Sequence, residues 1–228
     1  MASSRPLTPA RFVLTTFLSM ALASSALAAA RSPQVPVSGM ALATFFAAQG
    51  QAIAVNSQQL DLQRTSVPAS TGFGMRTFVG ASVSHGIYNA AAIAPALYQV
   101  YPGAATMGWF AVASFRTGPQ RLIVNLLDAS NTLQGQSTFL GADNTDFGFY
   151  EAGPGGTFYS QDARNASGNA RMLAFNGTGA FAGSTWLCTE TGTGPGGDFA
   201  DIITFVDLSL APVPTRASSW SRVKQLFR

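Results

Sequence analysis

The chain has 228 residues, of which only 10% are charged, and its 13 cations and 10 acidic residues give a formal net charge of +3. This length accommodates one domain with a sizeable core, or two small ones. The charges are unevenly spread, because residues 32–215 hold six arginines and no lysine against all ten acidic residues, for a net charge of −4. Nucleic-acid binding requires a clustered basic face, so we do not expect a nucleic acid as partner.

The first 30 residues read as a secretory signal peptide. Arg5 and Arg11 precede an apolar run over 12–27, and the small residues of an A-L-A site follow at 26–28. A basic start, a short apolar middle and an A-x-A site are the three parts of such a peptide, whereas a membrane span needs about 20 apolar residues. We expect cleavage near Ala28 to Ala30, at the end of a signal peptide over 1–30, and a chain that is secreted, extracellular or at the cell surface, with no transmembrane span after cleavage.

The rest of the chain reads as short strands separated by turns. An extended leader over 31–40 precedes a domain over 41–210, in which the apolar run 42–48 is compatible with either a strand or a helix. Many later runs are β-branched or aromatic, and their spacing of roughly 8–12 residues is typical of a sandwich or barrel. No long segment shows the i, i+3, i+4, i+7 pattern of an amphipathic helix. The predicted strands are 72–79, 85–89, 97–101, 107–115, 121–127, 146–151, 157–160, 171–175, 184–189 and 201–208.

Crossover helices are missing as well, so a parallel α/β sheet is not expected. We therefore predict a single all-β domain, an antiparallel β sandwich of jelly-roll-like form.

The last residues, 211–228, form a Pro-containing linker and a basic amphipathic tail. A short helix there would be capped by Ser218 or Ser219. Its apolar face would hold Trp220, Val223 and Leu226–Phe227. The alternatives are a frayed end, a sorting or attachment segment, and a weak interfacial helix.

The stretch 186–208 is the most informative, because acidic residues frame a Gly-rich turn in it. Glu190 ends one strand-like run, and Asp198 and Asp201 open the next. If the two runs pair as a hairpin, the three carboxylates reach one end of the sheet, provided that the chain bends near Ala200. Calcium takes about 6–8 oxygen ligands, among them carboxylates and backbone carbonyls. The sequence thus predicts a calcium site at Glu190, Asp198 and Asp201; the alternative is a solvated turn whose acids only shape the backbone.

Four further acids could contribute to this site from other loops. They are Asp143, Asp146, Glu151 and Asp162.

His85 is the chain's one histidine and Cys188 its one cysteine, which limits the catalytic options. A histidine base would have to be His85, which we interpret as a turn or sheet-surface residue, and no G-x-S-x-G motif occurs. One histidine and one cysteine do not make a His/Cys zinc site. Cys188 lies in an apolar run, so a buried small residue is favoured over an intermolecular disulfide. We predict a non-enzymatic protein; a glycoside-active enzyme using a carboxylate pair such as Glu151 with Glu190 is the less favoured alternative.

A carbohydrate-binding module is a further hypothesis, since aromatic residues on strands can form a platform for sugar rings. Aromatic residues on strands more often belong to the core, and neighbours such as Trp109 and Phe110 point to opposite faces. The partner classes are thus an extracellular polysaccharide or a surface protein. The candidate platform residues are Trp109, Trp186, Tyr98, Tyr101, Phe110 and Tyr159.

Four short landmarks follow one another between about Gly80 and Leu210. They are H-G-I-Y-N at His85 with L-Y-Q-V at Leu97, D-F-G-F-Y at Asp146, Y-S at Tyr159 with Asn165, Gly168 and M-L-A-F at Met172, and Glu190 with D-F-A-D at Asp198. Their order and spacing resemble a family of exported bacterial β domains of unknown function, common in proteins with a PEP-CTERM sorting tail, whose closing hallmark reads F-E-D…G-D-x-D-F-N-D. The resemblance implies an antiparallel β sandwich, extracellular placement and a calcium site, and it implies no known catalytic activity.

The chain departs from that family's pattern at four positions. Thr191 replaces the acid after the Glu, Gly196 the first Asp of G-D-x-D, Ala200 the Asn and Arg171 the usual His. The ending also lacks the apolar anchor and the terminal Arg cluster of the sorting tail. The sequence as a whole predicts a secreted, non-enzymatic surface or extracellular-matrix module with Ca²⁺ as its candidate cofactor. The acids that match the family are Glu190, Asp198 and Asp201.

Overall fold

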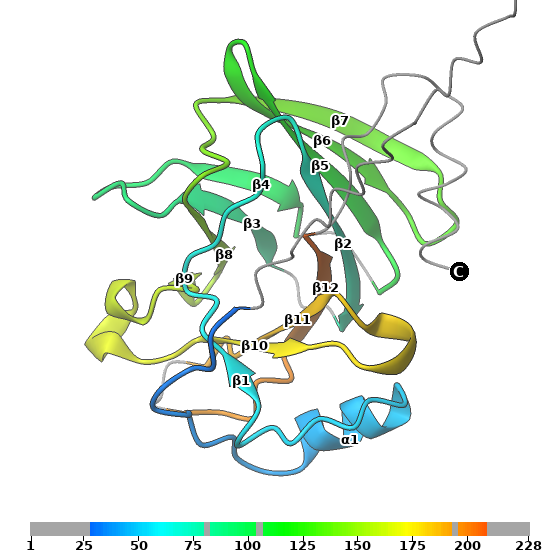
Figure 1. The fold of residues 1–228 in the computed structure, drawn as a ribbon, viewed down its shortest axis with the longest axis vertical. Helices are drawn as coiled ribbons and strands as arrows, with labels where there is room; N and C mark the ends of the chain where they lie inside the picture. The colour runs from blue at the N-terminus through cyan, green and yellow to red at the C-terminus, as the bar shows by residue number, and fades with distance from the viewer. Residues whose placement is uncertain (1–27, 80–82, 104–106, 193–195, 209–228) are drawn as a thin grey trace, which may run out of the picture.

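The computed structural model describes residues 28–79, 83–103, 107–192 and 196–208, so residues 1–27 of the predicted signal peptide and the whole predicted tail over 211–228 lie outside the described residues. Within these ranges the chain forms two antiparallel sheets and one short α-helix, which confirms the all-β sandwich (Figure 1). No helix among the described residues is long and apolar enough to cross a membrane.

The larger sheet has eight strands and the smaller has four. In spatial order the larger sheet contains β1 (Gln59–Leu60), β10 (Met172–Asn176), β11 (Thr185–Thr189), β12 (Ile202–Asp207), β2 (Gly72–Val79), β5 (Phe110–Thr117), β6 (Gln120–Leu127) and β7 (Leu133–Leu140). The smaller sheet contains β4 (Leu97–Tyr101), β3 (Ser84–Asn89), β8 (Phe147–Gly153) and β9 (Gly156–Tyr159). The helix is α1 (Ala41–Ala48), and the 3₁₀ turns are η1 (Asp162–Arg164), η2 (Ala166–Gly168) and η3 (Gly179–Phe181).

Each of the ten predicted strands corresponds to an observed strand, with ends displaced by at most a few residues. Residues 42–48, for which the sequence allowed either a strand or a helix, form part of helix α1. Leu42 and Phe46, one turn apart, both reach the core from this helix. Two strands, β1 and β7, were not predicted. The sequence of β7, L-Q-G-Q-S-T-F-L, carries few β-branched or aromatic residues and no strict alternation, so it gives only a weak strand signal.

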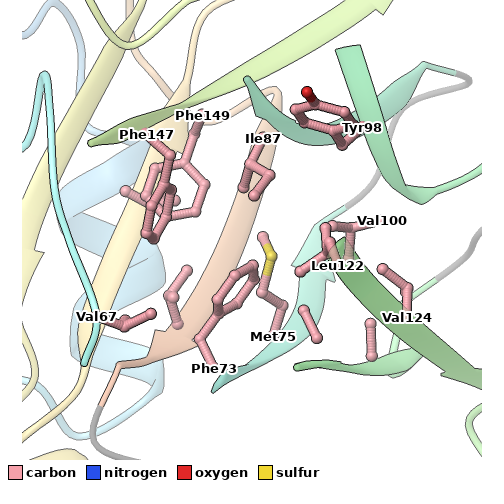
Figure 2. Close-up of a cluster of buried hydrophobic side chains, with 14 of the residues drawn as sticks. Val67, Phe73, Met75, Ile87, Tyr98, Val100, Leu122, Val124, Phe147 and Phe149 are labelled. Atoms are coloured by element: carbon pink, nitrogen blue, oxygen red, sulfur yellow. The ribbon is translucent and has the colours of Figure 1, made fainter. Parts of the chain in front are cut away.

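The main core lies between the two sheets, where alternating side chains of both inner faces meet (Figure 2). The Phe73 ring stacks on Phe147, with 5.8 Å between centroids, and meets Phe149 edge-on at 6.3 Å. Met75 and Ile87 extend this apolar contact from β2 to β3, and all five side chains are fully buried. The sheets are thus held together mainly by aromatic packing.

A second core covers the opposite face of the larger sheet, under α1. Trp186 on β11 is fully buried, and Phe45, Phe46, Phe181 and Phe205 surround its ring at centroid distances of 5.1–5.9 Å. Strands β11 and β12 therefore bury both faces, which explains why all the residues of β12 are buried rather than every second one.

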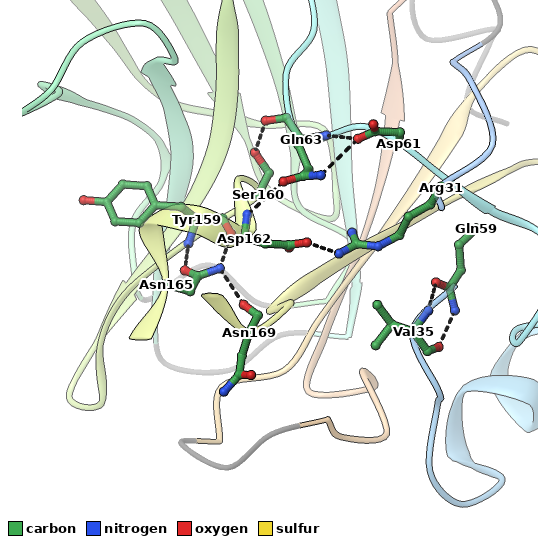
Figure 3. Close-up of polar contacts among 10 residues, drawn as sticks. All are labelled: Arg31, Val35, Gln59, Asp61, Gln63, Tyr159, Ser160, Asp162, Asn165 and Asn169. Atoms are coloured by element: carbon green, nitrogen blue, oxygen red, sulfur yellow. Dashed lines mark hydrogen bonds and ion pairs between the residues drawn. The ribbon is translucent and has the colours of Figure 1, made fainter. Parts of the chain in front are cut away.

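The predicted leader is extended, and it packs along the domain. Ala30 pairs with Leu60 of β1, and the Arg31 amide donates to the Gln59 carbonyl at 2.9 Å. The Gln59 side chain in turn bonds the amide and carbonyl of Val35, at 2.8 and 2.7 Å (Figure 3). The edge of the larger sheet at β1 is thereby covered by the chain itself.

Candidate functional site

The hairpin of β11 and β12 places the three predicted site residues at one end of the larger sheet, as the sequence indicated. Glu190 directly follows β11, and its side chain folds over the connecting loop. Its Oε1 accepts a hydrogen bond from the Gly192 amide at 2.8 Å, and its Oε2 accepts one from the Asp198 amide at 3.1 Å. One carboxylate thus joins both ends of the loop.

The two aspartates also bind backbone amides of this loop. Asp198 Oδ1 accepts from the Ala200 amide at 3.0 Å, which closes a turn, and Asp201 Oδ2 accepts from both the amide and the hydroxyl of Thr191, at 2.8 and 2.7 Å. The predicted bend occurs at Phe199, whose φ of 52° lies in the left-handed region while its ring is fully buried. Burial of that ring compensates for the unfavourable backbone conformation.

Two glycines are needed because Glu190 approaches the backbone closely. A Cβ at Gly197 would lie 1.9 Å from Glu190 Oε2, and one at Gly192 would lie 2.6 Å from Oε1. Both distances are far below a van der Waals contact, so any larger residue would displace the carboxylate. The Gly-rich composition of this loop therefore has a steric cause that does not involve a ligand.

The fit to calcium is poor in this arrangement. Among the described residues there is no group of three or more His, Cys, Asp or Glu side chains that could hold a metal ion, and residues 193–195 of the loop lie outside the described ranges. The three carboxylates accept from N–H groups, and a cation would have to compete with those donors. Calcium binding remains a prediction.

The four further acids also have protein partners. Asp146 pairs with Arg64, Asp162 with Arg31, Glu151 with His85, and Asp143 accepts from Thr145.

Thr191 occupies the position where the resembling family has a second acid, and it has a different role here. Its amide and hydroxyl are the donors that hold Asp201, so an acid at this position would replace a donor by a repelling charge. The two hydrogen bonds from Thr191 to Asp201 thus explain why a threonine fits this position of the loop.

His85 is buried, so the interpretation of it as a turn or sheet-surface residue was wrong. It lies in β3, 3% exposed, opposite Glu151 of β8, which is 1% exposed, and its Nδ1 is 3.1 Å from Glu151 Oε1. The imidazole is enclosed between the sheets near Tyr101 and Phe149. Alternation within β3 accounts for this position, because His85 and the core residue Ile87 share a face.

Cys188 is fully buried, as expected for a small residue in an apolar strand. Burial raises the pKa of its thiol well above the ordinary value, and the nearby Glu151 carboxylate raises that pKa further. The nucleophilic thiolate is therefore disfavoured at neutral pH.

The predicted aromatic platform does not form as one surface. Trp186, Tyr98, Tyr101 and Phe110 are buried, whereas Trp109 and Tyr159 are partly exposed. Trp109 packs against the core between the sheets. Tyr159 borders one open cavity, whose lining includes none of the other five candidates.

That cavity has a volume of about 550 Å³ and is open to solvent beside the smaller sheet. Its lining consists of Ile93, Ala94, Pro95, Tyr159, Ala163 and Arg164.

Arg164 fixes one wall of the cavity. Its guanidinium donates to the carbonyls of Ala90 and Ile93, at 2.9 and 3.3 Å, and stands 5.3 and 5.9 Å from the ring centroids of Tyr88 and Tyr159. It thus joins η1 to the loop that follows β3 and combines hydrogen bonds with cation–π contacts.

The Asn165 side chain fixes the backbone of Tyr159. Its Oδ1 accepts from the Tyr159 amide at 2.8 Å, and its Nδ2 donates to the Tyr159 and Asn169 carbonyls at 2.9 and 3.1 Å. Figure 3 shows the Tyr159 ring pointing away from this polar network. The sequence pointed to Tyr159 and Asn165 separately but gave no sign of the cavity. Arg164 and the loop at Ile93 are far apart in the sequence and come together only in the folded chain.

The fold and these sites define the chain as a two-sheet β sandwich with an acid-braced hairpin loop and an open cavity lined by an aromatic ring. No family model, no curated protein and no solved structure matches the chain. The resemblance to the exported β-domain family therefore remains a prediction.

We predict that Gly197→Ala destabilises the protein by about 1–3 kcal/mol, because the new methyl displaces Glu190 and leaves the loop amides without their acceptor. Urea unfolding measures this change. Gly135→Ala is the matched control, since a Cβ there meets nothing within 4 Å. If Gly197→Ala unfolds at the same urea concentration as the control, the bracing role of Glu190 is wrong.

The calcium prediction is tested by titration calorimetry and thermal unfolding. A weak site of the extracellular kind would raise the unfolding temperature at about 1–10 mM Ca²⁺. Asp198→Asn should abolish that rise, whereas Asp128→Asn, in a different turn, should preserve it. If these concentrations of Ca²⁺ give neither a heat of binding nor a rise in the unfolding temperature, the prediction of a calcium site is wrong.

Proposed function

We propose that this protein is an exported, non-enzymatic module of the cell surface or extracellular matrix. The observation that carries the non-enzymatic part is the burial of the chain's one histidine and one cysteine inside the sandwich. A general base or nucleophile must reach the substrate within hydrogen-bonding distance, and these two side chains do not reach solvent. Glu151, one member of the candidate glycoside pair, is enclosed in the same way.

The export part of the proposal rests on the N-terminal sequence. A basic start, an apolar run and an A-x-A site follow one another within residues 1–28. The low charge content and the absence of a second cysteine suit a domain that is stabilised by its core alone. In this role the sandwich presents its loops and edges to extracellular partners.

We predict that the full chain, expressed in a bacterium, is recovered outside the cytoplasm with a new N-terminus near Ala30. Leu18→Asp places a charge in the apolar run and should leave the protein inside the cell with residues 1–30 still attached. Fractionation and N-terminal sequencing measure both outcomes. Cytoplasmic recovery of the unaltered chain with residues 1–30 still attached would refute export.

Carbohydrate binding is the second candidate, and the open cavity is the observation that favours it. The Tyr159 ring beside Ile93 and Pro95 offers an apolar surface for one face of a sugar ring. The guanidinium of Arg164 adds positive charge at the same wall, which favours an acidic polysaccharide over a neutral one. A cavity of this size holds one or two sugar units of a longer chain.

We predict that an insoluble acidic polysaccharide retains the protein and that Tyr159→Ala lowers the affinity by about 2- to 10-fold, the usual contribution of one aromatic contact. Phe158→Ala is the matched control, since Phe158 is also a partly exposed aromatic residue of β9 but is absent from the cavity lining. Pull-down with each variant measures the effect. Equal retention of all three proteins, or none of the unaltered one, would exclude this cavity as a sugar site.

A further inference from the structure

The segment at the predicted cleavage region is paired with β1. Asp61 donates its amide hydrogen to the Ala29 carbonyl at 2.7 Å, and Ala30 bridges to Leu60. Ala29 and Asp61 are therefore opposite residues of an antiparallel pair. Such residues have Cα atoms about 5.5 Å apart, and the N–H of each is directed at the carbonyl of the other. The main-chain nitrogen of Ala29 thus lies beside Asp61.

Three charged side chains gather at this place, Arg31, Asp61 and Asp162, and we refer to them as the leader cluster (Figure 3). The Arg31 guanidinium, 7% exposed, forms an ion pair with Asp162. The Gln63 side chain joins the two acids, because it donates to Asp61 Oδ1 at 3.3 Å and accepts from the Asp162 amide at 3.0 Å. The summed charge of the cluster is −1, since two carboxylates share one guanidinium.

The pKa of Asp162 responds to this excess of negative charge. Burial raises that pKa above its ordinary value, the Arg31 guanidinium opposes the rise, and the Asp61 carboxylate adds to it. A second positive charge beside Asp61 would therefore favour the ionised form of both carboxylates.

Two A-x-A sites overlap in the predicted cleavage region, the first ending at Ala28 and the second at Ala30. A cut after Ala30 would remove the carbonyl to which Asp61 donates, together with the bridge to β1. A cut after Ala28 keeps both contacts. Of the described residues it removes Ala28 alone, whose methyl group is partly buried against the main core. The pairing with β1 is thus complete in a mature chain that begins at Ala29.

We propose that export cuts the chain between Ala28 and Ala29, and that the new α-ammonium group becomes the second positive charge of the leader cluster. A peptidase of the export route breaks this amide bond with one water molecule. The hydroxyl group of the water goes to the Ala28 carbonyl carbon and its hydrogen to the Ala29 nitrogen. The proton of the new acid then moves through solvent to the amine. This proposal rests on the export proposed for the chain.

Processing in this way completes the charge balance of the fold. Before the cut, the Ala29 nitrogen belongs to a neutral amide, and the leader cluster keeps its charge of −1. After the cut the sum is zero, and both a main-chain hydrogen bond and a charge attraction hold the mature end at β1. Because Asp61 is exposed, the attraction is modest and salt weakens it.

The first experiment identifies the cut by N-terminal sequencing and mass spectrometry of the exported chain, which we expect to begin at Ala29. Ala30→Leu, at an exposed position, removes the small final residue of the second A-x-A site only, so this variant should begin at Ala29 as well. If either exported chain begins anywhere else, the proposed cut is wrong and export still stands. Cytoplasmic recovery with residues 1–30 attached refutes export, and the cut with it.

The second experiment measures the charge by modifying the new amine. Lys224 is the one lysine of the chain, so Lys224→Arg leaves the α-amino group of the exported chain as its one amine. Acetylation removes the charge of that group, whereas reductive methylation keeps the charge. We expect the acetylated protein to unfold about 1–4 °C below the methylated one, in low salt at about pH 6, where an α-amino group is protonated.

Two variants and one change of solvent separate this attraction from other effects of acetylation. Asp61→Asn removes the carboxylate opposite Ala29, so the acetylated and methylated forms of that variant should unfold at the same temperature. Asp128→Asn, in a different turn, should keep the difference, and about 1 M salt should abolish it. Equal unfolding temperatures with Asp61 present, or a difference that Asp61→Asn leaves unchanged, overturn the role of the α-ammonium group.

Discussion

The burial of both faces of β11 and β12 is the constraint on which the rest of this structure depends. One face packs against the smaller sheet, and the other packs Trp186 against the aromatic residues of α1 and its neighbours. Because these strands are enclosed on two sides, the hairpin loop that joins them is held at a fixed place. The acids of that loop take their positions from this doubly covered hairpin, and the leader meets the loop where Val37 pairs with Gly197.

The carboxylates of the hairpin loop show that one type of side chain can stabilise a turn in two different ways. A carboxylate can share its oxygens with a cation or with backbone N–H groups, and both stabilise a turn rich in glycine. Here Glu190, Asp198 and Asp201 accept from amides, and Thr191 supplies a hydroxyl in addition.

The sequence was most informative where burial determines both the pattern of apolar side chains and the structure. Ten strands were predictable because apolar alternation reports burial, and the hairpin at Glu190 followed from two such runs. β7 was not predictable, since its exposed residues are under no packing constraint that would leave a pattern. The position of His85 between the sheets was also missed, because one polar residue in an alternating run gives no sign of the glutamate that meets it from another strand. The direction of the three carboxylates depends on loop backbone geometry, which includes the positive φ of Phe199 and cannot be read from residue types alone.

The leader has a consequence for the order in which the molecule can fold. Its main chain first meets Gln59 and Leu60 of β1, the next strand in the chain, whereas the Val37–Gly197 bridge and the Arg31–Asp162 ion pair join it to segments much farther along the sequence. Contacts of such long sequence separation form late and slowly. The leader can therefore pair with β1 early, and its contacts with Asp162 and Gly197 fix it fully only when those later segments have formed.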